Sequence, residues 1–328
     1  MITEGPAGNT TVYSKTSNST SLGDDQTCKI FSGEEIKCTI VVVVKRVAAS
    51  SSIVGCILVL GIIILFKLYR ALSQRMILHL SVASLFTSSA ILIEDVIYTS
   101  TFICKLQGAM LTFFIWECFL WTTLIMLSLY FRVVYGFDLR RFEMVLTLVL
   151  WIIPIIPTSL GFIYDLYAPA GAWCWMKNDV GWRLGTVYIW KIISVFIFIV
   201  VSVHILIVMH RQKARPFKDP TVLSTLNHDI RILRIYPIIY FVMNIFSIIV
   251  RIHNSLTTDE DQHGYIFTTL LLQNIADPLY GATLAMAYVL DRDTRTKINI
   301  IDIRTAIGRC CNRHKGRIKE FPVRPQIL

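Results

Sequence analysis

Residues 48–68 read AASSSIVGCILVLGIIILFKL, an almost unbroken apolar run. A helix needs about 20 mainly apolar residues to cross a hydrocarbon layer roughly 30 Å thick, and this run is long enough to do so. In the whole chain, 54% of the 328 residues are hydrophobic and 16% are charged, which leaves too few polar side chains to cover a soluble globule. The run and the composition together predict a protein embedded in lipid.

Six further apolar runs of similar length follow, each bounded by charged or turn residues. The seven candidate spans cover residues 47–68, 76–98, 105–134, 144–164, 185–209, 232–252 and 266–290. Pro154 and Pro157 inside the fourth run are compatible with a membrane helix, because neighbouring helices can satisfy the carbonyls that proline frees. We therefore predict an all-α membrane protein, a bundle of seven transmembrane helices.

The chain divides into four parts by composition: a polar N-terminal segment 1–45, a seven-helix domain 46–291, an amphipathic segment 292–309 and a basic tail 310–328. Isoleucines recur at helical spacing in the third part, opposite charged residues. Such a segment is expected to lie in the membrane interface as a short eighth helix, or to be an adsorbed tail without a signalling role. Cys310 and Cys311 directly after it are predicted palmitoylation sites.

Basic residues gather in alternate loops, which predicts the orientation because Lys and Arg near helix ends are retained on the cytoplasmic side. The loops on this side carry Lys67, Arg70, Arg75, Arg140, Arg141, Arg211, Lys213, Arg215 and Lys218. The other side carries Asp259, Glu260 and Asp261, and the sequons at Asn9 and Asn18 agree with glycosylation there. We expect a multi-pass plasma-membrane protein with its N-terminus outside, whose net charge of +10 attracts inner-leaflet lipids rather than nucleic acid.

Two cysteines fall on the expected outer side of different spans. Cys104 starts the third span, and Cys174 lies in the loop between the fourth and fifth spans. Both face an oxidising compartment, where the alternative to a bridge is two free thiols, so we predict a disulfide between them. Cys28 and Cys38 could close a second small loop.

Five short motifs carry a resemblance to a known family: Phe-Leu-Trp-Thr-Thr at 119–123, Ala-Trp-Cys-Trp at 172–175, Tyr-Pro at 236–237, Arg-Ile-His at 251–253 and Ala-Tyr at 287–288. Together they resemble the cyclic-AMP-receptor family, which groups slime-mould chemotactic receptors with plant and animal relatives. The Trp-Cys-Trp element is the most specific of them. The resemblance implies a G-protein-coupled receptor that catalyses nucleotide exchange on a heterotrimeric G protein after an extracellular small molecule binds.

Ionisable residues at membrane depth are expensive, so they are candidate functional residues. A contact between Glu117 and Lys191 would neutralise both, either to lock packing or to bind ligand. Asp277, directly before Pro278, could hold a cation or water cluster, or cap a kink. With the residues near the expected outer mouth, the ligand-binding candidates are Glu94, Lys105, Glu117, Trp175, Arg183, Lys191, Arg251 and Asp277.

The identity of the ligand stays open at this point. Lys105, Arg183, Lys191 and Arg251 are the groups that could hold the phosphate of cyclic AMP. The acidic residues among them do not demand an anion, and Trp175 could be an interface anchor instead of a stacking platform.

Arginines near the expected inner helix ends are the candidates for contact with a G protein: Arg132, Arg140, Arg141, Arg231 and Arg234. Attraction to lipid phosphates is the alternative role for them. Arg132 follows Leu-Tyr-Phe rather than forming the Asp-Arg-Tyr motif of rhodopsin-like receptors, which puts a latch role in doubt. The tail contains few Ser and Thr residues, so arrestin is the weakest of the expected partners.

Other classes of protein fit the sequence poorly. The seventh span has no lysine for a retinal Schiff base, and the seven histidines are scattered along the chain, so neither a retinal protein nor a zinc hydrolase is expected. The sequence contains no nucleophile constellation, phosphate-cradling loop or metal motif, and we expect neither enzymatic activity nor a cofactor. The alternative to a receptor is a seven-helix scaffold or channel that does not couple to G proteins.

Overall fold

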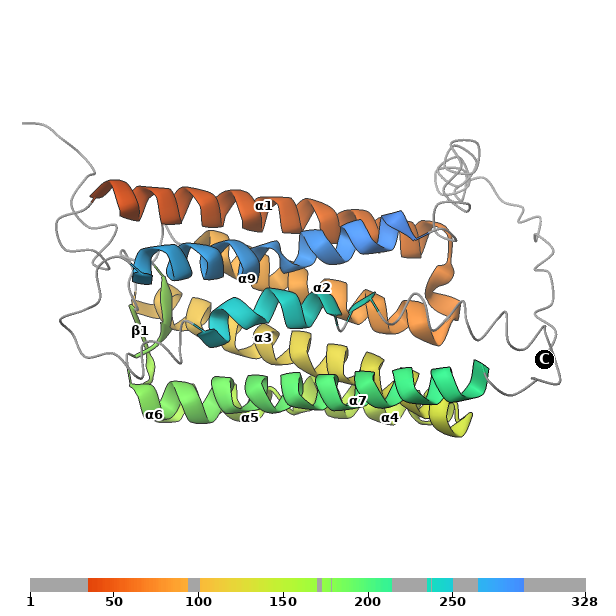
Figure 1. The fold of residues 1–328 in the computed structure, drawn as a ribbon. Coiled ribbons are helices and arrows are strands. Elements are labelled where there is room, and N and C mark those ends of the chain that lie inside the picture. The colour runs from red at the N-terminus through yellow and green to blue at the C-terminus, as the bar shows by residue number, and fades with distance from the viewer. Residues whose placement is uncertain are drawn as a thin grey trace, which may run out of the picture.

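The computed structural model describes residues 35–93, 101–169, 173–177, 179–213, 235–236, 238–249 and 265–291. These residues are mostly helical (Figure 1). Five helices in this part of the chain are long and apolar enough to cross a membrane: Thr39–Leu65, Leu72–Leu92, Thr101–Tyr135, Leu139–Ile163 and Gly181–Val208. Helical residues 238–249 and helix α9 (Tyr265–Leu290) coincide with the sixth and seventh apolar runs of the sequence.

Helix α1 (Glu35–Leu65) begins twelve residues before the expected first span, so it takes up part of the segment 1–45 that we expected to lie outside the helical domain. Val41 is buried on this extension, because the apolar run of the sequence continues back through Val41 and packs against the bundle. A helix of 31 residues is about 46 Å long, which exceeds a hydrocarbon layer of roughly 30 Å. The first helix therefore projects beyond the expected span.

The second and third expected spans each form one helix, α2 (Leu72–Leu92) and α3 (Thr101–Tyr130). The fourth is broken into α4 (Glu143–Ile152) and α5 (Ile155–Ile163). Pro154 lies at this break, where it lacks the N–H that would continue the hydrogen-bond ladder.

The fifth span begins with a short helix α6 (Val180–Arg183) and a π-helical turn, Leu184–Tyr188, and continues as α7 (Ile189–Lys213). Strands β1 (Tyr167–Pro169) and β2 (Cys174–Met176) form an antiparallel hairpin between α5 and α6. Figure 1 shows this hairpin at the same end of the bundle as the starts of α1 and α9. We call this end of the bundle the disulfide end, because β2 carries a disulfide. The far end of the bundle is called the opposite end.

The core of the bundle is built around α3. Trp121, Ile125 and Leu129 lie on one face of this helix and are almost fully buried. They belong to one apolar cluster with side chains from α1, α2, α7, α9 and residues 236–248. The apolar side chains of α4 and α5 are mostly exposed, as expected for helices that face lipid.

A side chain of α1 forms hydrogen bonds with the backbone of α9 at Pro278. In a regular helix Ala282 N–H would donate to the Pro278 carbonyl, but here it donates to Ser52 Oγ at 3.0 Å. Ser52 Oγ in turn donates to the Pro278 carbonyl. One hydroxyl thus gives a hydrogen-bond partner to two backbone groups of α9, one helical turn apart. Ser52 is fully buried, so these groups have no access to water in its place.

Replacing Ser52 by Ala is expected to lower the free energy of unfolding by about 1–3 kcal/mol, because two buried backbone groups lose their partner. The measurement is the thermal-unfolding midpoint of the purified protein. Ser51→Ala is the matched control, because the Ser51 hydroxyl bonds only within its own helix, to the Ala48 carbonyl at 2.7 Å. Equal midpoints for the two variants would show that the hydrogen bonds of Ser52 to the backbone of α9 do not stabilise the protein.

Candidate ligand-binding pocket

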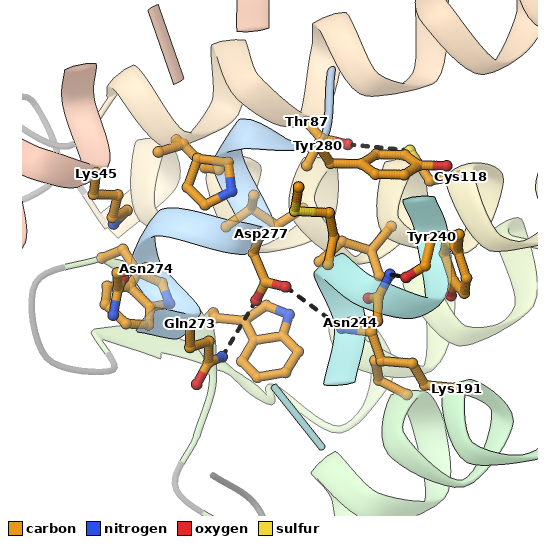
Figure 2. Close-up of a pocket in the computed structure, with 18 of the residues that line it drawn as sticks. Lys45, Thr87, Cys118, Lys191, Tyr240, Asn244, Gln273, Asn274, Asp277 and Tyr280 are labelled. Atoms are coloured by element: carbon orange, nitrogen blue, oxygen red, sulfur yellow. Dashed lines mark hydrogen bonds and ion pairs between the residues drawn. The ribbon is translucent and has the colours of Figure 1, made fainter. Parts of the chain in front are cut away.

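A cavity of about 130 Å³ lies inside the bundle, beneath the hairpin at the disulfide end (Figure 2). It receives side chains from six helical segments and from the hairpin. The residues that line it are Lys45, Thr87, Ile91, Leu111, Ile115, Cys118, Trp173, Trp175, Val187, Tyr188, Lys191, Tyr240, Met243, Asn244, Gln273, Asn274, Asp277, Pro278 and Tyr280. Three of the eight ligand-binding candidates from the sequence are among them.

An ion pair joins α7 and α9 at this cavity. Lys191 Nζ lies 3.8 Å from Asp277 Oδ1. Ser247 Oγ lies 2.6 and 2.7 Å from the two oxygens of Asp277, and Gln273 Nε2 donates to Oδ2 at 3.3 Å. Donors from α9 itself and from the segment 238–249 therefore fix the carboxylate, and Figure 2 shows it pointing away from its own helix. About a third of its side chain, 36%, stays exposed.

Glu117 does not make the contact with Lys191 that the sequence suggested. Its Oε2 accepts a hydrogen bond from Trp121 Nε1 at 2.8 Å, one turn further along α3. Its Oε1 has no hydrogen-bond partner among the residues that the structure describes, and the residue is fully buried. Glu117 also does not line the cavity, although its neighbour Cys118 does. Lys191, which we expected to pair with Glu117, pairs with Asp277 instead, because side chains of α7 and α9 meet at this level.

Arg183 supports the hairpin rather than the cavity. Its Nε and Nη2 donate to the Met176 carbonyl at 3.1 and 2.6 Å, and its guanidinium lies 5.4 Å from the ring centre of Trp175. Trp175 itself lines the cavity and packs edge-to-face on Tyr188. Arg183 therefore holds Trp175 in position without lining the cavity itself.

The predicted disulfide between Cys104 and Cys174 is confirmed, with Cα atoms 5.2 Å apart. Gln107 adds a second attachment that the sequence analysis missed. Its Oε1 accepts from the Cys174 backbone N–H at 2.8 Å, and its Nε2 donates to the Ala90 carbonyl at 2.8 Å. Gln107 lies three residues after Cys104, so it shares a helix face with it, and that spacing was the available signal. Strand β2 is thus tied to both α3 and α2.

Lys105 does not line the cavity, and it forms an ion pair at the turn before the hairpin. Its Nζ lies 2.6 Å from Asp165 Oδ1, while Lys177 Nζ lies 3.4 Å from Oδ2. These two lysines, Lys105 first, hold the pKa of Asp165 below its ordinary value. Asp165 has a left-handed backbone with φ of 48°, at the turn that follows α5.

Lys45 is a cavity residue that the sequence analysis placed in the N-terminal segment. It lies on α1, is 4% exposed, and its Nζ lies 4.1 Å from the ring centre of Trp173. The available signal was the pair Lys45 and Arg46, which interrupts the apolar run between Val44 and Val47. We did not predict Lys45 as a cavity residue, because we expected the first helix to begin at residue 47.

At the opposite end, Arg75 of α2 and Glu143 of α4 form an ion pair with two contacts, and both side chains are partly buried. His79, one turn after Arg75, stacks on Trp121 with ring centres 4.3 Å apart. Trp151 Nε1 donates to His79 Nδ1 at 3.4 Å. Side chains of α2, α3 and α4 are therefore linked below the cavity.

The Arg75–Glu143 pair is expected to contribute roughly 1–2 kcal/mol of coupling in a double-mutant cycle, since it has two contacts and is partly shielded from water. The cycle compares the unfolding midpoints of Arg75→Ala, Glu143→Ala and the double variant. Arg70→Ala is the control, because this exposed arginine lies nearby. Additive effects of the two substitutions would show that the pair contributes no coupling.

The arginines expected to face a G protein are placed only in part. Arg140 and Arg141 are exposed in the turn before α4, and Arg132 is half-buried in a π-helical turn, Phe131–Tyr135. Several expected features lie outside the described residues: Asn9, Asn18, Cys28, Glu94, Arg231, Arg234, Arg251, the amphipathic segment 292–309, Cys310 and Cys311, together with the side chain of Cys38.

Comparison with known proteins identifies the family. Residues 31–288 match the family described as slime mold cyclic AMP receptor. The chain belongs to this family. This receptor family is the one that the five short motifs resembled, and with the apolar helices it makes the chain a multi-pass membrane protein of a receptor family.

Individual members of the slime mold cyclic AMP receptor family and related proteins match only in part. Cyclic AMP receptor-like protein A of Dictyostelium discoideum is 31% identical over 133 residues, which cover 40% of this chain and 35% of that protein. Cyclic AMP receptor 2 of the same organism is 31% identical over 149 residues, covering 43% and 40%. G-protein coupled receptor 1 of Arabidopsis thaliana is 27% identical over 143 residues, covering 43% of each chain. The matches thus span about two fifths of the relatives' lengths.

Proposed function

We propose that this member of the family is a cell-surface G-protein-coupled receptor with seven transmembrane helices. A small molecule binds in the cavity at the disulfide end, which faces outward, and a heterotrimeric G protein docks at the opposite end. The observation that carries the proposal is the Lys191–Asp277 ion pair on the wall of a cavity in a protein of a receptor family. Ionic groups at this depth are expensive to maintain, which supports a functional role.

The arrangement of the helices supports a route from ligand to G protein. Lys191 lies on α7 and Asp277 on α9, so a ligand between them changes the distance between these helices. Pro278, whose carbonyl accepts a hydrogen bond from Ser52 of α1, follows Asp277 directly. A ligand that favours one arrangement of the pair would shift the population of the bundle toward it. Exposed Arg140 and Arg141, at the opposite end, are available for contact with a G protein or lipid phosphates.

The size of the cavity bears on whether cyclic AMP is the ligand. A cavity of about 150 Å³ accommodates benzene, whereas pockets for drug-sized ligands occupy about 300–1,000 Å³. The cavity here is about 130 Å³, which suits a compound of about one ring in size. A cyclic nucleotide carries a base, a sugar and a phosphate, so it exceeds this volume, and part of it would lie outside the cavity unless the hairpin or the helices moved apart. Cyclic AMP therefore stays a candidate to test rather than the preferred ligand.

The experiment is nucleotide exchange on a panel of purified heterotrimeric G proteins by the reconstituted protein, with and without cyclic AMP and small metabolites. Exchange that depends on an added compound is the expected result. Exchange without added compound would mean constitutive coupling. If a correctly folded sample accelerates exchange on none of them, the scaffold or channel alternative is favoured, and a current across a bilayer would identify the channel.

Lys191→Met is expected to raise the concentration of agonist needed for half-maximal exchange by about tenfold or more, because the ligand loses a charged partner. Asp277 keeps its contacts with Ser247 and Gln273 in this variant. Lys177→Met is the matched control, because Lys177 lies at the same end but pairs with exposed Asp165 outside the cavity. Equal shifts in both variants would show that Lys191 has no specific role in binding.

A further inference from the structure

The charges around the cavity point to a class of ligand, on the proposed premise that the cavity is the ligand site. We infer that it binds a compact zwitterion, a molecule that carries an ammonium and a carboxylate a few bonds apart, as an α-amino acid does. The carboxylate of the ligand pairs with Lys191 and its ammonium with Asp277. The inference rests on the position and support of these two side chains.

Asp277 presents its charge to the cavity in a fixed position. Both of its oxygens accept hydrogen bonds, from Ser247 and from Gln273, which is how an ionised carboxylate behaves. These donors lie on the segment 238–249 and on α9 itself, so they do not depend on α7. The carboxylate therefore keeps its place when Lys191 turns toward a ligand.

A ligand with a single charge gains little from this site. Because Lys191 Nζ and Asp277 Oδ1 are 3.8 Å apart, an anion beside the lysine is also close to the carboxylate, and attraction and repulsion largely cancel. The same holds for a simple cation, with the signs exchanged. A zwitterion instead gives each of the four charges two neighbours of opposite sign, an arrangement in which no desolvated charge is left uncompensated.

Lys45 adds a preference for a carboxylate over a simple amine. It lines the same cavity, so the described wall carries two lysines and one carboxylate, Asp277. An amine without an acidic group would bring no anion of its own to a wall that carries two lysines. A phosphate or a carboxylate without an amine would face Asp277. Among small molecules, those with both groups match the wall best.

The remaining wall sets the size of the ligand and the nature of its side chain. Trp175, Tyr188, Tyr240 and Tyr280 present aromatic surfaces to the cavity. Aromatic faces attract an ammonium and pack against an apolar side chain. Because the volume is about 130 Å³, an amino acid with a short aliphatic or single-ring side chain fits better than a larger compound.

The test measures binding by the thermal-unfolding midpoint of the full-length protein in lipid nanodiscs, independently of any G protein. L-Alanine, L-leucine and L-phenylalanine are the zwitterions. Leucinamide keeps only the ammonium of leucine, N-acetyl-L-leucine keeps only the carboxylate, and cyclic AMP is included for comparison. We expect at least one amino acid to raise the midpoint, and leucine to bind about tenfold or more tightly than either derivative.

Two variants locate the site. Lys191→Met and Asp277→Asn should each lose the stabilisation by the amino acid, whereas Lys177→Met should retain it. If Asp277→Asn does not fold, the derivatives of leucine still test the wild-type protein, and Lys191→Met tests the location. Equal stabilisation by leucine and one of its derivatives overturns the inference, as does an absence of stabilisation by all three amino acids.

Failure of this inference is distinguishable from failure of the proposed function. If an amino acid binds but no G protein exchanges nucleotide, the ligand class stands and the proposed function is wrong. If cyclic AMP or another single-charge compound drives exchange while no amino acid binds, the receptor function stands and the ligand class is wrong.

Discussion

Replacing Cys104 by Ser lowers the free energy of unfolding by about 4 kcal/mol in the loop-closure description, the largest effect we expect among the substitutions considered. The Cys104–Cys174 disulfide closes a loop with a sequence separation of 70 residues, and this long loop gains freedom in the unfolded chain when the bond is absent. The expected readout is a fall of several degrees in the thermal-unfolding midpoint of the purified protein.

Cys174→Ser should lower the midpoint by the same amount, and the double variant should lower it no further, because either substitution removes the same bond. Cys118→Ala is the matched control: this buried cysteine is a free thiol in the same helix as Cys104. A Cys104→Ser protein that unfolds at the wild-type temperature would show that Gln107 alone holds the hairpin, through its contacts with Cys174 and Ala90.

The membrane helices were predictable because a span needs a minimum length of apolar sequence, a requirement that can be read locally. The ends of the helices were less predictable. Helix α1 continues back to Glu35 because its early residues pack on the bundle, a contact that no local pattern reveals. The fourth run was expected to form one helix, but Pro154 divides it into two. Together the two helices still form one candidate membrane span.

The residues of the candidate site were predictable where a charged side chain interrupts an apolar membrane helix. Lys191 and Asp277 were singled out because charges at membrane depth are costly. Their pairing was not predictable, because it depends on how α7 and α9 are rotated toward each other. Glu117 was an equally reasonable partner for Lys191 by depth alone, yet it accepts from Trp121 on its own helix. Asn244 and Gln273 were missed because uncharged polar residues in a membrane helix give a weaker signal.

Gly281→Ala is expected to lower the free energy of unfolding by about 1–3 kcal/mol, because an added methyl group overpacks a closed contact. A Cβ at Gly281 would lie 2.6 Å from Ser84 Oγ and 2.7 Å from Cys56 Sγ, well inside ordinary contact distances. Helices α1, α2 and α9 meet here, so no single side chain can turn away to make room. The midpoint of thermal unfolding should fall accordingly.

Gly61→Ala is the matched control, since a Cβ at this glycine of α1 would meet nothing within 4 Å. Ala has the higher helix propensity by about 1 kcal/mol, so this variant should be as stable as the wild type or slightly more so. The Gly281 variant should also recover part of its loss in a Ser84→Ala background, where the nearest atom is gone. Equal midpoints for Gly281→Ala and Gly61→Ala would contradict close packing at this crossing.

The same substitution connects packing to the proposed site. Gly281 lies one helical turn after Asp277. The hydrogen bonds of Ser52 with Pro278 and Ala282 join α1 to this part of α9. When α9 shifts to admit a methyl group, Asp277 shifts with it relative to Lys191, which α7 carries. Gly281→Ala should therefore weaken agonist-driven exchange as well as stability, whereas Gly61→Ala should weaken neither. A Gly281→Ala protein with a lowered midpoint but an unchanged agonist response would show that the position of α9 does not control the ion pair.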